Sequence, residues 1–269
     1  MVRIGIKTLV IVVSIVTLNA CTKIKTPVFP GEILDLTYPF DNETIYWPTA
    51  EPFALEEETH GVTERGYFYA ANRYHASEHG GTHLDAPSHF VEGKHSIEQI
   101  PPNQLLGPGY VIDVSAKALR NPDMQVTVED FLEWEKEYGR IPDGSIVLIK
   151  TGYGMYWPNR EKYLGTAQRG PEALPLLHFP GLHPGAARWL TTNRNIKAVG
   201  IDTASIDFGQ SENFLSHQTL FQANIPAIEN VAALEKIPQQ GFTVIALPMK
   251  IARGTGAPTR VIAILPKKN

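Results

Sequence analysis

The chain of 269 residues is 43% hydrophobic and 19% charged, and its formal net charge is −4 at neutral pH. This length can bury a substantial core in one large or two small domains, and the composition excludes a disordered chain. The acidic balance, with no cluster of Lys and Arg interleaved with aromatic residues, argues against nucleic acid as a partner.

The first 20 residues have the pattern of a bacterial lipoprotein signal peptide. A positively charged start is followed by an apolar run from Leu9 to Val16, and small residues lead to Cys21. The run is short for a membrane-spanning helix, although an uncut signal anchor is the alternative. We expect acylation of Cys21 to attach the chain to a membrane. Because Thr22 follows where an Asp would favour inner-membrane retention, the segment resembles those of outer-membrane lipoproteins that face the periplasm.

A polar segment with two prolines, residues 21–31, is predicted to be a tether to a single domain that spans residues 32–269. Apolar, β-branched or alternating residues predict strands over residues 32–36, 64–73, 109–114, 146–150, 198–201, 244–248 and 261–265. Helices are predicted over residues 128–138, after Thr127 as N-cap, and over residues 185–193 and 229–234. Strands outnumber helices, which indicates an α+β or mixed α/β fold with a single core.

The most informative stretch runs from His79 to His89 and reads His-Gly-Gly-Thr-His-Leu-Asp-Ala-Pro-Ser-His. Its glycines and its proline oppose a regular helix. We therefore expect an extended backbone, in which every second side chain lies on the same face. The side chains on that face that could bind a metal or transfer a proton are His79, His83, Asp85 and His89.

Imidazole nitrogens and a carboxylate form a ligand set that suits zinc or manganese, and the carboxylate could also bridge two ions. A bound metal lowers the pKa of water and polarises a carbonyl group, and a further histidine beside it could shuttle protons. A single histidine is more often a surface or packed residue, but four such side chains on one face are hard to explain by packing. Because Cys21 is the only cysteine, a Cys-rich zinc cluster is excluded.

This stretch resembles the cyclase family, which includes bacterial kynurenine formamidases and isatin hydrolases and has the signature H-x-G-T-H-x-D-x-P-x-H. The match is unbroken from His79 to His89. Further similarity covers residues 35–37, 47–48, 151–153, 156–158, 163–165, 200–203 and 205–207. The resemblance implies a mixed α/β domain with the swivelling β/β/α fold around a central mixed sheet, assembled as a homodimer or tetramer.

The resemblance also implies a divalent metal, with two ions of Zn or Mn per subunit. The signature aspartate would reach both ions, and later ligands would be a histidine and a glutamate that match His217 and Glu229. From the residues alone, His217 could equally be a surface residue and Glu229 a carboxylate at a helix N-terminus. The expected metal ligands are thus His79, His83, Asp85, His217 and Glu229.

A metal-activated water is then expected to attack the carbonyl of a formamide or cyclic amide, while His89 returns a proton to the leaving nitrogen. Trp47 matches the family's substrate-side tryptophan, and together with Tyr153, Tyr156 and Trp157 it could frame a flat aromatic or heterocyclic amide. Packing in the core or in a dimer would explain these aromatic residues equally well.

The export signal is a departure from the family members that act on kynurenine intermediates, because those are cytosolic. Two alternatives to amide hydrolysis stay open. One is hydrolysis of an ester or lactone at the same site, and the other is a non-catalytic lipoprotein that binds a metal or a small ligand.

Overall fold

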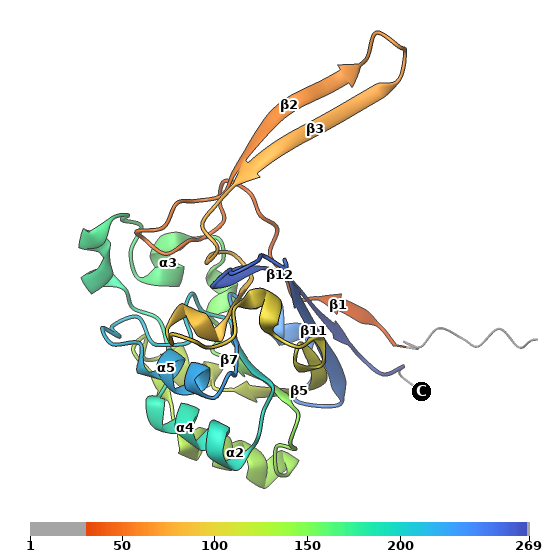
Figure 1. The fold of residues 1–269 in the computed structure, drawn as a ribbon. Coiled ribbons are helices and arrows are strands. Elements are labelled where there is room, and N and C mark those ends of the chain that lie inside the picture. The colour runs from red at the N-terminus through yellow and green to blue at the C-terminus, as the bar shows by residue number, and fades with distance from the viewer. Residues whose placement is uncertain (1–30, 268–269) are drawn as a thin grey trace, which may run out of the picture. The chain divides into compact units, whose positions relative to one another are not determined.

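A computed structural model describes residues 31–267 of the chain (Figure 1). The predicted signal peptide, residues 1–20, and the tether before Gly31 lie outside this range and stay predictions. Within residues 31–267 no helix has both the length and the apolar character needed to cross a membrane.

A mixed sheet closes on itself and forms the centre of a single α/β domain, as expected. The strand order is β1-β12-β11-β5-β7-β9-β10-β4, and β12 also pairs with β4, so seven strands close into a barrel-like ring with β1 added outside it. Strands β5, β7, β9 and β10 run parallel, and the other pairings are antiparallel. The strands are β1 Ile33–Asp35, β4 His83–Asp85, β5 Leu106–Asp113, β7 Ile146–Lys150, β9 Ala198–Ile201, β10 Ala227–Glu229, β11 Phe242–Pro248 and β12 Gly256–Ile264.

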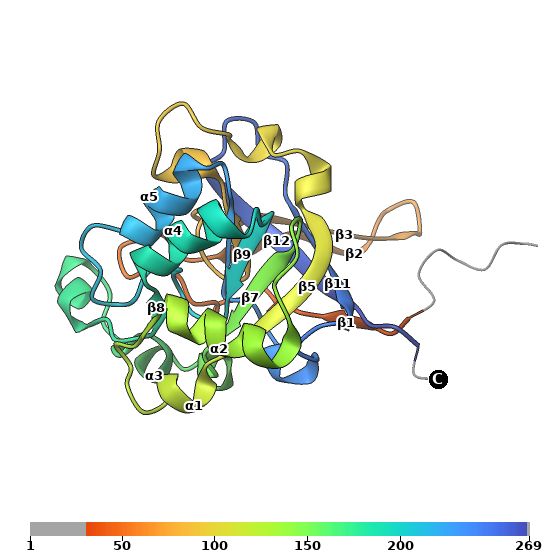
Figure 2. The ribbon, with the colours of Figure 1, turned by 90° about the horizontal axis from the view of Figure 1, so that it is seen from below.

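Helices cover one side of the parallel strands, and Figure 2 shows α2, α4 and α5 beside β7 and β9. Strand β7 is almost entirely apolar because both of its faces are buried. Val147 and Ile149 pack in the cluster with the helices, while Ile146 and Leu148 belong to the cluster on the other face, with strands β11 and β12. The helices are α1 Ser115–Ala118, α2 Val128–Tyr138, α3 Arg160–Leu164, α4 Pro184–Asn193 and α5 Leu215–Gln222.

Short elements complete the domain. Strands β6 Gln125–Val126 and β8 Gly181–Leu182 form a small parallel pair. The 3-10 helices are Pro87–His89, Ile97–Gln99, Pro102–Gln104, Tyr153–Tyr156, Pro171–Leu176 and Leu234–Lys236.

The helix predicted over residues 128–138 is confirmed as α2. Its N-cap is Thr127, whose side chain accepts from the backbone at Asp130 while the Asp130 carboxylate accepts from the Thr127 N–H at 2.8 Å. This reciprocal capping is a local signal, so the sequence alone could find it.

The helix predicted over residues 229–234 is wrong. Glu229 ends strand β10, which pairs with β9 on one side and β4 on the other. Asn230 and Ala233 then take positive φ values of 53° and 56°, which a helix does not allow. Pairing with two distant strands decides the conformation here, and local propensity does not.

A long antiparallel hairpin joins β2, Ala54–Val62, to β3, Phe68–His75. The strand predicted over residues 64–73 corresponds to β3, which starts later because a turn occupies the residues before Phe68. Strand β2 was not predicted, since its run of three glutamates, residues 56–58, hides any apolar alternation. In Figure 1 this hairpin extends away from the barrel strands.

Candidate metal centre and cavity

All six residues predicted to bind metal or transfer protons line one cavity of about 380 Å³. Trp47 lines the same cavity. The site is assembled at the junction of β4, β10 and α5, so residues 79 to 89 meet residues more than 100 positions later. The predicted residues that come together are His79, His83, Asp85, His89, His217 and Glu229.

Strand β4 is short and buried, and it places His83 and Asp85 on one face because they lie two positions apart. The neighbouring strand β10 is antiparallel, and its register sets Glu229 directly opposite His83. His217 enters from the first turns of α5. Sheet pairing therefore brings the glutamate to the site, and helix docking brings the later histidine.

The expectation of a continuous extended backbone from His79 to His89 is only partly right. Gly81 has a φ of +56°, and a Cβ there would lie 2.6 Å from the Phe40 ring, so glycine is required at this turn. Extended pairing is limited to β4, and Pro87 then starts a 3-10 helix that ends at His89. The four side chains still converge, but two turns direct them rather than strand alternation alone.

Two of the histidines are oriented by acceptors outside the cavity. The Nδ1 atom of His83 donates to the Gly81 carbonyl at 2.9 Å, and Nδ1 of His217 donates to the Asp207 carboxylate at 2.6 Å. Asp207 also accepts from the backbone N–H of Ser216 and of His217, each at 3.1 Å, which ties the start of α5 to the same carboxylate. Because Nδ1 of each histidine is used in these hydrogen bonds, the other ring nitrogen, Nε2, faces the cavity.

His79 is oriented by a chain of two further side chains. The Thr255 hydroxyl donates to the Glu78 carboxylate at 2.7 Å, so its oxygen is free to accept from Nε2 of His79 at 3.0 Å. The Nδ1 atom of His79 then faces the site. Gly256 makes room for this ring, because a Cβ there would lie 2.5 Å from His79 Cε1.

The inward nitrogens meet two buried carboxylates. His79 Nδ1 lies 2.6 Å and His83 Nε2 3.1 Å from Oδ1 of Asp85, while His217 Nε2 lies 3.3 Å from Oδ2 of Asp85. Glu229 contributes Oε1 at 3.0 Å from His217 Nε2 and Oε2 at 3.5 Å from His83 Nε2. Among the described residues, the buried His83 Nε2 has no hydrogen-bond partner. The inward ring nitrogens and the carboxylate oxygens are electron-rich groups directed at one another, and a cation between them would stabilise this arrangement.

The electrostatics of the site agree with this inference. Burial alone would lower the pKa of His83, but the carboxylates of Asp85 and Glu229 outweigh it and raise that pKa to about 9. The pKa of His217 is also raised well above its ordinary value, because Asp207, Asp85 and Glu229 outweigh burial. The site therefore favours positive charge. Three imidazole nitrogens and two carboxylates fit a divalent metal, and His83, Asp85 and Glu229 can offer ligand atoms within 4.8 Å of one another.

His89 lies beside this donor set. Its ring stacks on the ring of His79, with centroids 3.8 Å apart and an interplanar angle of 17°. Burial and the neighbouring histidines lower the pKa of His89 to about 4, although the charge of Asp85 opposes this. His89, His79 and Asp85 can also offer ligand atoms within 4.8 Å of one another.

Aromatic side chains form much of the remaining wall. Trp47 contacts Phe214 edge-on at 6.2 Å between centroids, and Phe90 lies 5.1 Å from the same Phe214 ring. Phe214 has a φ of 49°, an uncommon conformation for a bulky residue, and this places it at the start of α5 beside the cavity. No pattern in the sequence indicated Phe90 or Phe214 as wall residues.

The other aromatic residues that could have framed a substrate do not line this cavity. Tyr153 is buried and contacts Tyr156 edge-on, and both belong to one hydrophobic cluster. Trp157 stacks on Tyr38 with centroids 4.1 Å apart. Packing is thus the explanation for Tyr153, Tyr156 and Trp157.

The residues that orient the histidines were missed in the sequence, namely Asp207, Thr255 and Glu78. Asp207 lies in a segment that matches the family pattern, residues 205–207, and this was its only signal. Thr255 is 176 residues from His79, and nothing local indicates their contact.

Known proteins with similar sequences and structures include proteins named as hydrolases. The Cyclase family model matches residues 34–208. An isatin hydrolase from Roseibium aggregatum is 32% identical over 221 residues, which cover 78% of this chain and 81% of that protein. A kynurenine formamidase from Bacillus cytotoxicus is 26% identical over 232 residues, which cover 86% of this chain and 97% of that protein.

The fold is similar to that of a solved isatin hydrolase as well. Isatin hydrolase A from Labrenzia aggregata, bound to benzyl benzoate, superposes with a TM-score of 0.79 at 34% identity. The superposition covers 88% of this chain and 94% of that chain.

Proposed function

Because this chain belongs to the cyclase family, we propose that it is a metal-dependent hydrolase that cleaves an amide-type C–N bond outside peptides. The observation that carries the proposal is the set of three inward imidazole nitrogens and two buried carboxylates in a cavity with aromatic side chains in its wall. The relatives named isatin hydrolase and kynurenine formamidase support the class of reaction.

We propose that the metal ligands are His79, His83, Asp85, His217 and Glu229. When bound, the metal supplies Lewis acidity that activates water and polarises the carbonyl under attack. The two oxygens of Asp85 face different histidines, Oδ1 toward His79 and His83 and Oδ2 toward His217, which supports two ions that share this carboxylate. Nitrogen and carboxylate ligands suit Zn or Mn.

His89 is proposed to accept a proton from the attacking water and to deliver it to the leaving nitrogen. Its ring lines the cavity and stacks on His79, so it lies beside the ligand set and faces the space where a substrate would bind. Because His89 is not among the proposed ligands, it can transfer a proton without releasing the metal.

The substrate is proposed to be an aromatic or heterocyclic amide. A cavity of about 380 Å³ is at the small end of the range for ligand sites. Its wall contains Trp47, Phe90 and Phe214, whose flat faces and edges suit an aromatic ring. Isatin and N-formylkynurenine are the first compounds to test.

The test is a screen of metal-loaded protein against isatin, N-formylkynurenine and an aryl ester, each with and without a chelator. We expect amide turnover that the chelator abolishes and that added Zn²⁺ or Mn²⁺ restores. Turnover of the ester alone would favour an esterase or lactonase. Stoichiometric metal without turnover of any amide or ester would favour the non-catalytic binding lipoprotein and contradict the proposal.

We further propose that the chain is exported and anchored by acylation of Cys21, in an outer membrane and facing the periplasm, and that it is a homo-oligomer. The lipoprotein pattern of residues 1–21 supports the first part. Fractionation of a Cys21→Ala variant tests it, because a variant that stays in the outer-membrane fraction would contradict the anchor.

A further inference from the structure

Asn230 is a buried polar residue that directly follows the proposed metal ligand Glu229, and only 1% of its surface is exposed. Its φ of 53° lies in the left-handed region, where asparagine is found far more often than bulky residues. This conformation ends strand β10, and the residue lines the cavity. A buried polar side chain is generally hydrogen-bonded, so its partners indicate which part of the site it holds.

The side chain of Asn230 contacts the turn that lies between His79 and His83. Its Nδ2 donates to the Gly81 carbonyl at 2.7 Å, although the two residues are 149 positions apart in the sequence. The same carbonyl accepts from Nδ1 of His83 at 2.9 Å, the bond that directs Nε2 of His83 into the cavity. A carbonyl oxygen has two lone pairs, so the amide and the imidazole can both be bound at once.

The backbone carbonyl of Asn230 holds the next residue of this turn. It accepts from the Thr82 hydroxyl at 2.7 Å, and that hydroxyl accepts in turn from the Tyr38 N–H at 3.0 Å. Asn230 thus binds two consecutive residues, Gly81 with its side chain and Thr82 with its main chain. Because Gly81 has a φ of +56°, these bonds fix a turn that the backbone alone would not define closely.

Asn230 is itself held by residues outside this turn. The Tyr163 hydroxyl lies 2.9 Å from Oδ1 of Asn230 and 3.0 Å from the Asp202 carbonyl, so its single proton is shared between two acceptors. The backbone N–H of Asn230 donates to the Thr203 carbonyl at 2.9 Å. Asn230 therefore has a fixed place in the fold from which it can hold Gly81.

We propose that Asn230 is a positioning residue for the metal ligand His83, because its amide holds the Gly81 carbonyl that orients the His83 ring. A carbonyl that is bound by a second donor is less free to turn away from Nδ1 of His83. Since Asn230 follows Glu229 in the chain, the same contacts couple two ligands, and their facing atoms, His83 Nε2 and Glu229 Oε2, are 3.5 Å apart. The inference rests on the metal centre proposed above.

The test uses two substitutions of Asn230 that have opposite side effects. Asn230→Gly removes the amide at a positive φ that glycine adopts freely, but it leaves a small void. Asn230→Leu keeps the branching and the number of heavy atoms, but it crowds its neighbours and strains the backbone. In both variants Tyr163 keeps the Asp202 carbonyl as an acceptor. Loss of the amide is the change that the two variants share.

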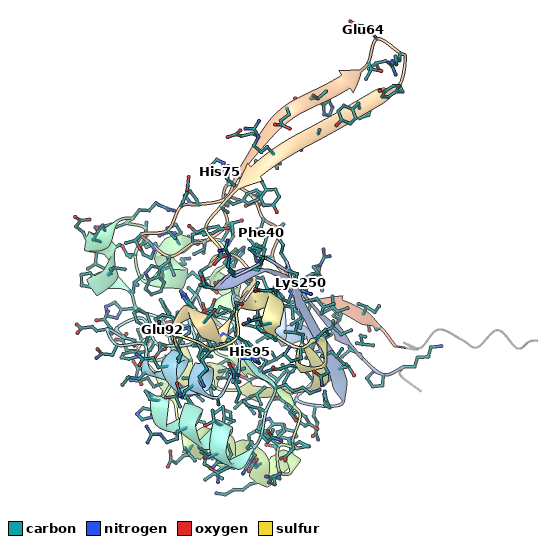
Figure 3. All side chains as sticks on the ribbon, in the orientation of Figure 1. Phe40, Glu64, His75, Glu92, His95 and Lys250 are labelled. Atoms are coloured by element: carbon teal, nitrogen blue, oxygen red, sulfur yellow. The ribbon has the colours of Figure 1, made fainter. Side chains whose placement is uncertain are left out.

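Asn224 provides the matched control. Its φ is 56°, close to the 53° of Asn230, and its Oδ1 accepts from the His95 N–H at 3.1 Å. Asn224 does not line the cavity. Figure 3 shows His95, the partner of Asn224, apart from Phe40, whose ring lies against Gly81. Asn224→Gly and Asn224→Leu therefore make the same two changes away from the metal ligands.

The first measurement is the NMR signal of the His83 Nδ1–H in the full-length chain, labelled with ¹⁵N at histidine and loaded with Zn²⁺ in detergent. This signal is identified by its absence in His83→Gln. In wild type and both Asn224 variants the proton should be protected from exchange with water. In both Asn230 variants we expect this protection to be lost. Calorimetric titration of the metal-free proteins should show a Zn²⁺ affinity about tenfold lower in the Asn230 variants alone.

Each other outcome contradicts the proposal. Wild-type protection and affinity in the Asn230 variants would overturn it, and so would equal losses in the Asn224 variants, which would indicate general loosening of the domain. A loss in Asn230→Gly alone would assign the effect to the void, and a loss in Asn230→Leu alone to strain. Urea unfolding shows which variants fold, and if one Asn230 variant does not, the other decides.

Failure of this proposal and failure of the proposed function are distinguishable. A wild type that binds no stoichiometric Zn²⁺ or Mn²⁺ would contradict the metal centre itself. A wild type that binds the metal, together with Asn230 variants that match it, would contradict only the role of Asn230.

Discussion

Nδ1 of His217 lies 2.6 Å from Oδ2 of the buried Asp207, and this contact decides which ring nitrogen of His217 faces the cavity. Because the carboxylate accepts a hydrogen bond from Nδ1–H, the other ring nitrogen, Nε2, is directed at Asp85 and Glu229. Asp207 thus acts on the metal through the histidine, as a positioning residue.

Replacing Asp207 with Asn should weaken metal binding. The amide lacks the charge that holds the ring, and we expect the affinity for Zn²⁺ or Mn²⁺ to fall about 10- to 100-fold. The measurement is calorimetric titration of the metal-free protein. Ser211→Ala is the comparison. It removes a 3.4 Å contact of Ser211 Oγ to the other oxygen of Asp207 and the 3.2 Å bond that Oγ accepts from the Phe214 N–H, but it leaves the carboxylate in contact with His217. Equal affinities for Asp207→Asn and wild type would refute the positioning role.

Thr255→Val should have a similar effect on His79. The variant removes the oxygen that accepts from His79 Nε2 at 3.0 Å, and it also leaves Glu78 without one of its donors. We expect metal affinity to fall by about tenfold, at the low end of the usual range for such partners, because the acceptor is neutral. Thr255→Ser keeps the hydroxyl and should recover affinity close to that of wild type. A serine variant as weak as the valine variant would point to packing instead.

Removing the carboxylate of Glu135 should reduce the stability of the domain and its dependence on pH. Its two oxygens accept from Nε and Nη2 of Arg194, each at 2.6 Å, and Oε1 also accepts from the Ile141 N–H at 2.9 Å. Burial alone would raise the pKa of Glu135, but these contacts outweigh it and lower the pKa below its ordinary 4.5. A lowered folded-state pKa means that the stabilisation is complete above about pH 4.5 and is lost as the pH falls through the folded value.

Glu135→Gln should therefore lower the free energy of unfolding by about 2 kcal/mol at pH 7. The difference from wild type should shrink below about pH 4.5, where the wild-type carboxylate becomes protonated. Urea unfolding at several pH values measures both effects. Asp35→Asn is the comparison, because its ion pair with Arg260 is exposed and should contribute less than about 1 kcal/mol. A constant difference down to about pH 3 would contradict the assignment.

Elements with local signals could be predicted from the sequence, and elements decided by distant partners could not. Strand β7 and helix α2 were found because a buried apolar run and the Thr127 N-cap are local features. The conformation at Glu229 depends on pairing with β4, more than 140 residues earlier, so the helix predicted over residues 229–234 was wrong. Only one strand of the β2–β3 hairpin was predicted, because three consecutive glutamates interrupt β2 and no buried face imposes alternation.

The same distinction between local signals and distant contacts applies to the candidate site. The stretch from His79 to His89 concentrates four chemical groups within eleven residues, so its chemistry could be inferred from residue types and spacing alone. His217 and Glu229 entered only through resemblance to a family, since each alone has an ordinary explanation. The orienting roles of Asp207 and Thr255 could not be predicted from the sequence, because they depend on contacts that form only in the folded barrel.

His89→Ala separates the proton transfer from the metal site. The ring stacks on His79 but is not among the proposed ligands, so the variant should keep the metal content of wild type. Loss of the group that protonates the leaving nitrogen should lower kcat by roughly 10²- to 10⁴-fold. Metal is measured by atomic absorption, and kcat with the best substrate of the screen. The loss should be smaller for a substrate with a more acidic leaving group, because such a group departs with less help. Full activity in His89→Ala would remove its proton-transfer role, whereas loss of metal would place His89 among the ligands.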